Sequence, residues 1–282
     1  MNGNTLIIAH LGYPTASFTA PLIYNPFFAA RGINAAIVTM GVKPEDFANL
    51  LRPLFKLTNI RGALVTMPHK MSAVDLLDEV TPAVEIAGSC NAILKRDDGS
   101  LLGQIFDGEG FVAALANGGF AVAGKRALII GCGGVGSAIA ASLASCRIDS
   151  LSLHDVQHRR ASALRDRLLK HFPTLEIRTG SAQPEGHDLI VNATPLGSKD
   201  NDPLPLNPSH LSPTMMIGDV VLADGMTPLL SAALAKGCRI QPGIDVLYEQ
   251  IPAHLEFFGF PSASLKELRE IVRGDSWRGA QD

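Results

Sequence analysis

The feature that most constrains the fold of this chain is a glycine-rich turn between an apolar run and an alanine-rich segment. The run at 127–130 reads Ala-Leu-Ile-Ile, which is typical of a buried β-strand, and it leads into Gly131-x-Gly133-x-x-Gly136. The segment at 137–145 is typical of a helix. Glycines at these positions permit a tight turn, close approach of a pyrophosphate, and close packing of helix on strand. The pattern predicts a strand–turn–helix unit that binds a dinucleotide, and the alternative is a glycine-rich turn without a ligand.

An acidic residue at the end of the next apolar run completes this pattern. Asp155 follows the run at 151–154, and an acid at this position hydrogen-bonds to the ribose in dinucleotide-binding folds. Gly134 and Val135 lie inside the turn itself. We therefore predict that the whole turn and Asp155 contact the dinucleotide.

The composition excludes several classes of protein. The chain has 282 residues, of which 46% are apolar and 18% charged, so one large or two ordinary domains can build a substantial core. The formal net charge is −3 and the basic residues are scattered, which argues against nucleic acid or an anionic membrane as partner. No basic region followed by a long apolar stretch opens the chain, and no run reaches the ~20 apolar residues of a membrane span. We expect a cytoplasmic protein that acts on a small molecule.

The cysteines and histidines give no sign of a disulfide framework or a metal site. The four cysteines are far apart and form no CxxC pair, so we expect them to be reduced. No group of His, Cys, Asp and Glu has the spacing of metal ligands, and we predict no metal.

Strand and helix signals alternate along the first hundred residues. Strands are expected at 5–11, 33–40 and 60–67, and helices at 21–31, 44–57 and 70–80. Such alternation implies βαβ units and a mostly parallel sheet. The segment at 91–106 differs, because Asp98-Gly99 predicts a hairpin turn in its middle.

A second series of the same kind begins near Asp107. Its strands are expected at 127–130, 150–155, 175–179, 188–192, 215–222 and 239–241, and its helices include 159–172 and 228–236. No strand follows the helical segments at 244–258 and 264–272, so we expect them to pack back on the first domain.

We therefore predict an α/β fold of two domains with a cleft between them. A substrate domain with a mostly parallel sheet is expected over 1–106 together with 245–282. A Rossmann dinucleotide-binding domain is expected over 107–244.

Lys70 is a candidate for the proton-transfer group that the first domain must then supply. An apolar strand stops at Pro68, and Lys70 opens the segment that follows. A lysine in the first turn of a helix meets an unfavourable macrodipole, and partial burial also disfavours its charge, so both effects suit proton exchange. The alternative is a surface lysine that merely follows a turn.

Asp107 and Asn91 are the other polar candidates. Asp107 lies where a hairpin strand leads into a helix, so its simplest role is an N-cap, although a carboxylate close to Lys70 would also hold the ammonium in position. Asn91 can donate a side-chain hydrogen bond or sit in a turn.

Several motifs spread over the chain share their order and spacing with one known family. They are Thr66-x-Pro68-x-Lys70, Ala87-Gly88-Ser89-Cys90-Asn91-Ala92, Asp107-Gly108-x-Gly110, the glycine turn, Asn192-Ala193-Thr194-Pro195-x-Gly197, Asp219-Val220-Val221, Thr227-Pro228-Leu229-Leu230 and Gln250. In this arrangement the chain resembles the shikimate dehydrogenase family over essentially its whole length.

The resemblance implies roles for particular residues. Lys70 and Asp107 would be the catalytic pair, the lysine exchanging a proton with the reacting hydroxyl and the aspartate orienting it. Thr66, Asn91 and Gln250 would hold substrate hydroxyls. The implied reaction is reversible hydride transfer between a nicotinamide and a ring hydroxyl of shikimate, quinate or a related cyclic hydroxy acid.

The cofactor half of the family pattern is present with one change. The motif residues Asn192, Thr194 and Pro195 join the expected cofactor contacts. Relatives that use NADP carry Asn-Arg-Thr after the second strand, whereas this chain has Asp155-Val156-Gln157. An aspartate there accepts hydrogen bonds from a ribose hydroxyl and repels a phosphate, so we predict NAD over NADP, although Arg159 and its neighbour Arg160 could compensate.

The substrate half departs further from the family. Phe18, Ala20 and Leu222 stand where the family places the two serines and the tyrosine that hold the substrate carboxylate. Ser17 and Thr19 lie one residue away and could substitute. Burying a carboxylate without donors is costly. We therefore hypothesise that shikimate is a poor substrate and that a related cyclic polyol or hydroxy acid is preferred.

Two further questions are open at this stage. The same fold could serve a non-catalytic NAD-binding sensor or regulator, but the retained Lys70 and Asp107 favour an enzyme. The family includes monomers and dimers, so either a monomer or a homodimer is expected.

Overall fold

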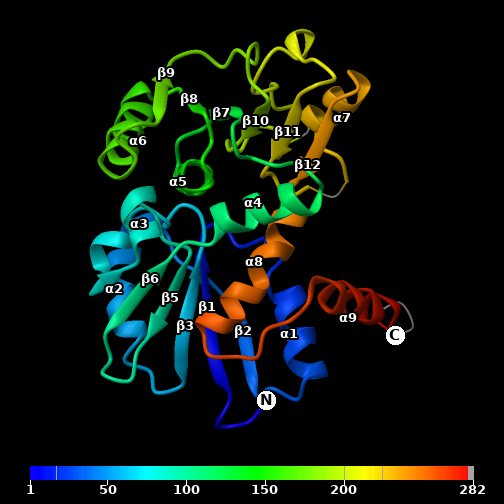
Figure 1. Ribbon diagram of the computed structural model, residues 1–282. Coiled ribbons are helices and arrows are strands. Elements are labelled where there is room, and N and C mark those ends of the chain that lie inside the picture. Colours follow the sequence, from blue (N-terminus) through cyan, green and yellow to red (C-terminus); the bar gives the residue numbers. More distant parts are fainter. Residues whose placement is uncertain (17, 200, 224, 279–282) are drawn as a thin grey trace. The chain divides into compact units, whose positions relative to one another are not determined.

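The protein divides into two compact units (Figure 1). The computed structural model describes residues 1–16, 18–199, 201–223 and 225–278. The first unit contains Met1–Val84, Ser89–Phe106 and the chain from Ile251 on. The second contains Glu85–Gly88 and Asp107–Gln250. This division returns to the first unit at 251 where the sequence suggested 245, and it assigns 85–88 to the second unit.

Strands of the first unit form one mixed sheet. Among the described residues these strands are β1 (Leu6–Gly12), β2 (Ala35–Gly41), β3 (Ile60–Val65), β4 (Glu79–Val80), β5 (Ala92–Lys95) and β6 (Leu101–Gln104). Their order is β2-β1-β3-β5-β6-β4, with β1 parallel to β2 and β3, and β5 antiparallel to β3 and β6. The βαβ alternation in the sequence thus corresponds to the parallel strands β2, β1 and β3. The hairpin β5–β6 extends the sheet beyond β3.

Helices accompany this sheet. They are α1 (Pro21–Ala30), α2 (Pro44–Leu54) and α9 (Leu265–Arg278), while the boundary between the units falls inside α3 (Pro82–Ala87) and inside α8 (Gly243–Phe257). The C-terminal helix α9 packs against α1, red beside blue in Figure 1. After α8, the ring of Phe258 lies against Gly62 of β3. The backbone carbonyl of Phe258 accepts a hydrogen bond from Arg61 Nε. The chain from Ile251 on thus belongs to the first unit, as expected, whereas residues 244–250 of the predicted segment belong to the second.

The segment expected as a helix at 70–80 is not one. It forms turns, a single 3₁₀ turn (Val74–Leu76) and then strand β4. The N–H of Asp78 donates to Leu101 O, and the N–H of Thr81 donates to Gly103 O. Its backbone groups therefore pair with the sheet, which the apolar periodicity of the segment could not reveal.

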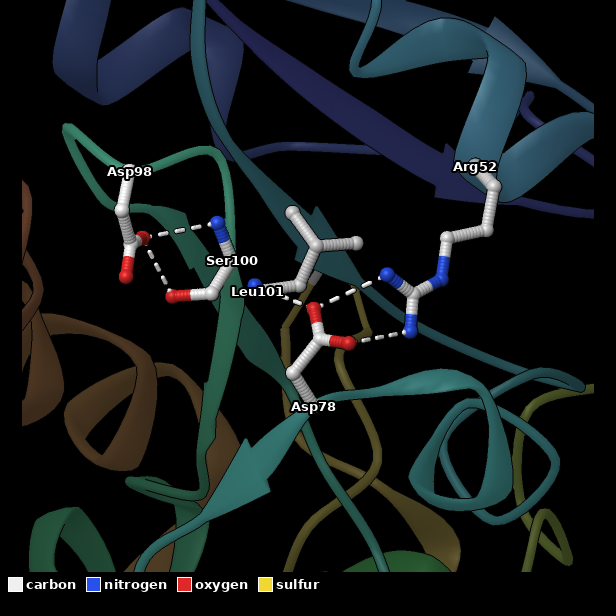
Figure 2. Close-up of polar contacts among 5 residues, drawn as sticks. All are labelled: Arg52, Asp78, Asp98, Ser100 and Leu101. Carbon is white, nitrogen blue, oxygen red and sulfur yellow. Dashed lines mark hydrogen bonds and ion pairs between the residues drawn. The ribbon is translucent and has the colours of Figure 1, made fainter.

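Side chains of Arg52 and Asp78 reinforce that pairing, as Figure 2 shows. The two terminal guanidinium nitrogens of Arg52, Nη1 and Nη2, each donate to the Asp78 carboxylate at 2.8 Å. This contact lowers the pKa of Asp78. The same carboxylate accepts the N–H of Leu101. In the predicted hairpin turn, Asp98 accepts hydrogen bonds from the N–H and hydroxyl of Ser100, which closes the β5–β6 connection.

The second unit is built on a fully parallel sheet. Among the described residues its strands are β7 (Arg126–Ile130), β8 (Ser150–His154), β9 (Glu176–Thr179), β10 (Leu189–Asn192), β11 (Met216–Asp219) and β12 (Arg239–Pro242). They lie in the order β12-β11-β10-β7-β8-β9. This is the order of the doubly wound dinucleotide-binding fold. Its ligand crevice opens at the point where the strand order reverses, which here lies between β7 and β10. The predicted Rossmann domain is confirmed.

Helices of the second unit include α4 (Asp107–Asn117), α5 (Gly134–Ser145), α6 (His158–His171) and α7 (Pro228–Ala235). Helix α4 packs closely on α5. The two helices come so near that a Cβ atom on Gly108 would lie 2.1 Å from the Ala138 carbonyl oxygen. No helix in the described part of the chain is both long and apolar enough to cross a membrane.

The glycines of the turn after β7 have different surroundings. Gly131 adopts φ +99°, a backbone conformation that side chains disfavour. A Cβ atom on Gly136 would lie 1.9 Å from Gly131 O, whereas a Cβ on Gly133 would meet nothing within 4 Å. Gly136 is thus required by packing, and Gly133 leaves open space.

Gly136→Ala is therefore expected to destabilise the fold. The added methyl group collides with a backbone oxygen, and overpacking of this kind costs about 3 kcal/mol, which exceeds the helix propensity gained. Gly133→Ala is the matched control and should change the free energy of unfolding by less than about 0.5 kcal/mol. Urea denaturation measures both, and equal stability of the two variants would contradict the packing argument.

Candidate active site

The backbone around Lys70 is fixed by neighbouring strands. Thr66 follows β3, and its N–H donates to Leu11 O at the end of β1. The carbonyl of Lys70 accepts the N–H of Cys90 at 2.7 Å, and the N–H of Val65 donates to Asn91 O. Lys70 is 9% exposed. The structure thus brings Thr66, Lys70 and Asn91 together at one end of the first sheet, and Lys70 is not the surface lysine of the alternative interpretation.

Asn91 has a defined side-chain orientation. Its Oδ1 accepts the backbone N–H of Phe106 at 3.0 Å, and the residue is buried. The amide oxygen therefore supports the fold, and the Nδ2 group is the end that carries donors. Thr19, also expected at the substrate, is half-buried, whereas Ser17 lies outside the described residues.

His69, next to Lys70, serves the fold. Its Nε2 bonds the carbonyl of Val42 at 2.8 Å, and its ring stacks on Phe47 with centroids 4.1 Å apart. Burial of this ring helps to hold the turn that presents Lys70.

His10 is a candidate that sequence analysis missed. It lies near the end of β1, and its pKa is lowered to about 4 by burial and by the charge of Lys70. Its ring packs against Phe18, with centroids 4.2 Å apart and planes inclined by 30°. The available signal was one histidine in an otherwise apolar strand, which no motif distinguishes from a core residue.

The glycine turn of the second unit fits a dinucleotide. Open space surrounds Gly133, the residue before α5, so a phosphate can approach the backbone and the N-terminal N–H groups of that helix. Gly134 and Val135 form the first turn of α5. A Cβ on Gly131 would lie 2.7 Å from Ala193 O, so the loop after β10 closes on the same crevice.

The loop after β10 is held by a buried polar network. Asn192 Nδ2 donates to Asp219 Oδ1 and to Leu196 O, while its Oδ1 accepts the N–H and hydroxyl of Thr194. Thr227, the N-cap of α7, donates its hydroxyl to Asp219 Oδ2 at 2.7 Å. Burial raises the pKa of Asp219, and these hydrogen bonds oppose that shift.

In that network Asn192 and Thr194 shape the loop, and only the neighbouring Pro195 is exposed. The supporting residues Asp219 and Thr227 belong to motifs that the sequence displays, but their pairing is a tertiary contact.

Asp107 and Gln250 lie on helices that touch within the second unit. Asp107 is the first residue of α4 and is 6% exposed. Gly110, one turn later, lies against Val246 and Gln250 of α8, and a Cβ there would come within 2.9 Å of Val246 O. Gln250 is 7% exposed. Leu222, where the family pattern has a tyrosine, is 44% exposed.

The Asp155 carboxylate is used inside the fold. Its Oδ2 accepts the N–H of Cys132 at 2.8 Å and its Oδ1 accepts the N–H of Gln157 at 2.7 Å. The residue is 6% exposed, and burial together with this carboxylate raises the pKa of Cys132 to about 12. Asp155 therefore joins the end of β8 to the glycine turn.

In the described part of the chain no group of His, Cys, Asp and Glu could hold a metal ion. A parallel sheet in this order, with a glycine turn at its reversal point, defines a dinucleotide-binding domain. A second α/β unit with a buried lysine at the end of its sheet is consistent with a dehydrogenase of two domains.

Comparison with known proteins identifies the family. The model of the shikimate dehydrogenase substrate binding domain matches residues 11–93. Proteins named shikimate dehydrogenase (NADP(+)) from Rubrobacter xylanophilus and Moorella thermoacetica are 34% and 36% identical, covering 98% and 97% of this chain and 98% and 94% of their own lengths. The shikimate 5-dehydrogenase of Thermus thermophilus, solved with NADP(H) and shikimate, is 26% identical with a TM-score of 0.84, over 95% of this chain and 99% of that one.

The chain belongs to the shikimate dehydrogenase family. It is therefore an oxidoreductase that acts on a CH–OH group with a nicotinamide cofactor, and the sensor alternative is not favoured.

The predicted preference for NAD is wrong. Both full-length relatives are named for NADP(+). Asp155 also has a role inside the fold, since each of its carboxylate oxygens accepts a backbone N–H, so its place in the motif did not by itself establish a contact with the ribose.

Removal of these contacts should destabilise the second unit. Asp155→Ala leaves two backbone N–H groups without their acceptor and is expected to cost about 1–3 kcal/mol of unfolding free energy. Asp155→Asn keeps one acceptor oxygen and should cost less. Chemical denaturation of the three proteins checks this order, and an alanine variant as stable as the parent would show that water replaces the carboxylate at no cost.

Proposed function

We propose that this protein catalyses reversible hydride transfer between NADP(H) and a ring hydroxyl of shikimate or a closely related cyclic hydroxy acid. Full-length similarity to proteins named shikimate dehydrogenase (NADP(+)) carries the proposal. The buried Lys70 at the end of the first sheet supports it, since a proton must leave the hydroxyl as the hydride leaves its carbon.

In this mechanism the bound nicotinamide supplies the hydride acceptor in one direction and the donor in the other. During oxidation the neutral amine of Lys70 takes the hydroxyl proton and becomes an ammonium, and during reduction that ammonium returns the proton to the carbonyl oxygen. Asp107 is proposed as its partner, which would orient the Lys70 side chain and offset the charge of the ammonium form. Burial keeps competing water away from both groups.

Binding of the substrate ring is assigned to the residues that the family resemblance implies. In Asn91 the donor end is Nδ2, while Oδ1 accepts the Phe106 N–H. Thr66 and Gln250 supply further hydrogen bonds to hydroxyls. Thr19 and Ser17 complete the proposed set.

The 2′-phosphate of NADP is assigned to the start of α6. Arg159 and Arg160 are exposed in the first turn of this helix, directly after the β8 turn. Guanidinium groups and helix N–H groups both favour phosphate. A monomer or homodimer remains the expectation for the assembly, and sedimentation equilibrium decides between them.

Lys70→Met should abolish proton transfer. We expect kcat to fall by about 10²–10⁴-fold, with Kd for the dinucleotide unchanged, because general acid–base catalysis contributes on this scale. Asp107→Asn should lower kcat less, since it retains the shape of the side chain. Lys56→Met, at an exposed lysine, is the control. Steady-state kinetics and fluorescence titration check this, and full turnover by the Lys70 variant would refute the assigned role.

The enzyme should use NADP with the higher kcat/KM. Replacing Arg159 and Arg160 together by alanine should raise KM for NADP at least tenfold, about the 1.4 kcal/mol of a lost charge-assisted contact, and leave KM for NAD within about twofold. Lys170→Ala, near the other end of α6, is the control. Higher kcat/KM with NAD in the parent enzyme would contradict this assignment.

A further inference from the structure

A buried histidine beside the candidate catalytic lysine has one nitrogen without a partner. His10 is 8% exposed, and among the described residues no group hydrogen-bonds to its Nδ1. His69, also in the first unit, differs, since its Nε2 bonds the carbonyl of Val42. A buried polar atom left unpaired costs free energy, and such atoms in a folded protein call for an explanation.

The ring of Phe18 covers this histidine. The two centroids lie 4.2 Å apart, and Phe18 Cζ lies 2.6 Å from the position of a Cβ on Gly12. Thr66 Cγ2 lies 2.5 Å from that same position. His10, Phe18 and Thr66 therefore meet over Gly12, where β1 and β3 end and where the segment leading to Lys70 begins.

The surface made by His10 and Phe18 is electrically neutral at physiological pH. Burial and the charge of Lys70 lower the pKa of His10 to about 4, so its imidazole is uncharged. A neutral imidazole can donate one hydrogen bond and accept another, which suits a hydroxyl or an ester oxygen. Because His10 Nδ1 is itself inaccessible to solvent, a ligand reaches it only if a neighbouring side chain shifts, and the half-buried ring of Phe18 is the neighbour assigned to do so.

We propose that His10 and Phe18 form a neutral substrate-binding wall beside Lys70, and that the substrate presents an uncharged oxygen-bearing group to it rather than a carboxylate. A carboxylate placed against an aromatic ring loses its water and gains at most one hydrogen bond from the imidazole. In the proposed function Lys70 meets the reacting hydroxyl and is not part of this wall. This inference rests on the proposed function, and it names His10 as a residue that binds substrate and Phe18 as one that sets specificity.

The experiment compares shikimate with its methyl ester, which differ in charge at one position. Values of kcat and KM are measured for both compounds with NADP, and binding of both is measured by calorimetry. The parent enzyme should give the ester a kcat/KM equal to or above that of the acid. A preference for the acid of tenfold or more, in kinetics or in binding, would overturn the proposal.

Substitutions in the wall then test each residue. Phe18→Ser supplies a hydroxyl donor and should shift the ester-to-acid ratio toward the acid by at least tenfold. His10→Leu should raise KM for both compounds at least tenfold with kcat within about threefold, and His10→Asn, which keeps a side-chain donor, should recover part of that loss. An unchanged KM in His10→Leu, or an unchanged ester-to-acid ratio of kcat/KM in Phe18→Ser, would contradict the proposed substrate-binding wall.

Thermal unfolding of the same variants separates binding from folding. If His10→Leu has the KM and the Tm of the parent enzyme, His10 does not bind substrate. If His10→Leu does not fold, His10→Asn and Phe18→Ser carry the test. Failure of the proposed function is a different result, because no turnover of either compound would then occur in the parent enzyme with NADP or NAD. The calorimetric preference between acid and ester still decides the wall in that case.

Discussion

The close approach of helix α5 to the glycine turn is the constraint on which the second unit depends. The turn can close only because residue 136 has no side chain, since a Cβ there would lie 1.9 Å from Gly131 O. Asp155 holds the same turn from the other side through the N–H of Cys132. With these contacts in place, the N-terminus of α5 faces the crevice between β7 and β10, which is where a dinucleotide-binding fold presents helix N–H groups to phosphate.

The first unit solves a different problem, which is how to hold a lysine and several polar groups at the end of a sheet. It does so with backbone hydrogen bonds between loops, such as Cys90 N–H to Lys70 O, and with side chains that are consumed by the fold. Asn91 uses its oxygen in this way, and His69 uses its ring. His10 differs from these two residues, since no described group hydrogen-bonds to its Nδ1.

Much of the fold followed from local patterns. Most strands, most helices and the Asp98-Gly99 turn could be predicted because apolar periodicity and turn chemistry act over a few residues. The segment at 70–80 could not, because its backbone pairs with β6 more than twenty residues away. The candidate site divided in the same manner: the glycine turn was evident from spacing, whereas the stacking of Phe18 on His10 joins residues that no motif connects.

The sequence by itself determined the fold class, the dinucleotide turn and the family, since each is written in consecutive residues or in the order of motifs. Only the tertiary structure decided what individual polar side chains do. Asp155 has the position of a ribose-binding acid, yet in the fold its oxygens accept backbone N–H groups from Cys132 and Gln157 and so hold the glycine turn. A motif specifies which residue stands at a position, but the partners that occupy its hydrogen-bonding atoms are brought there by the folded chain.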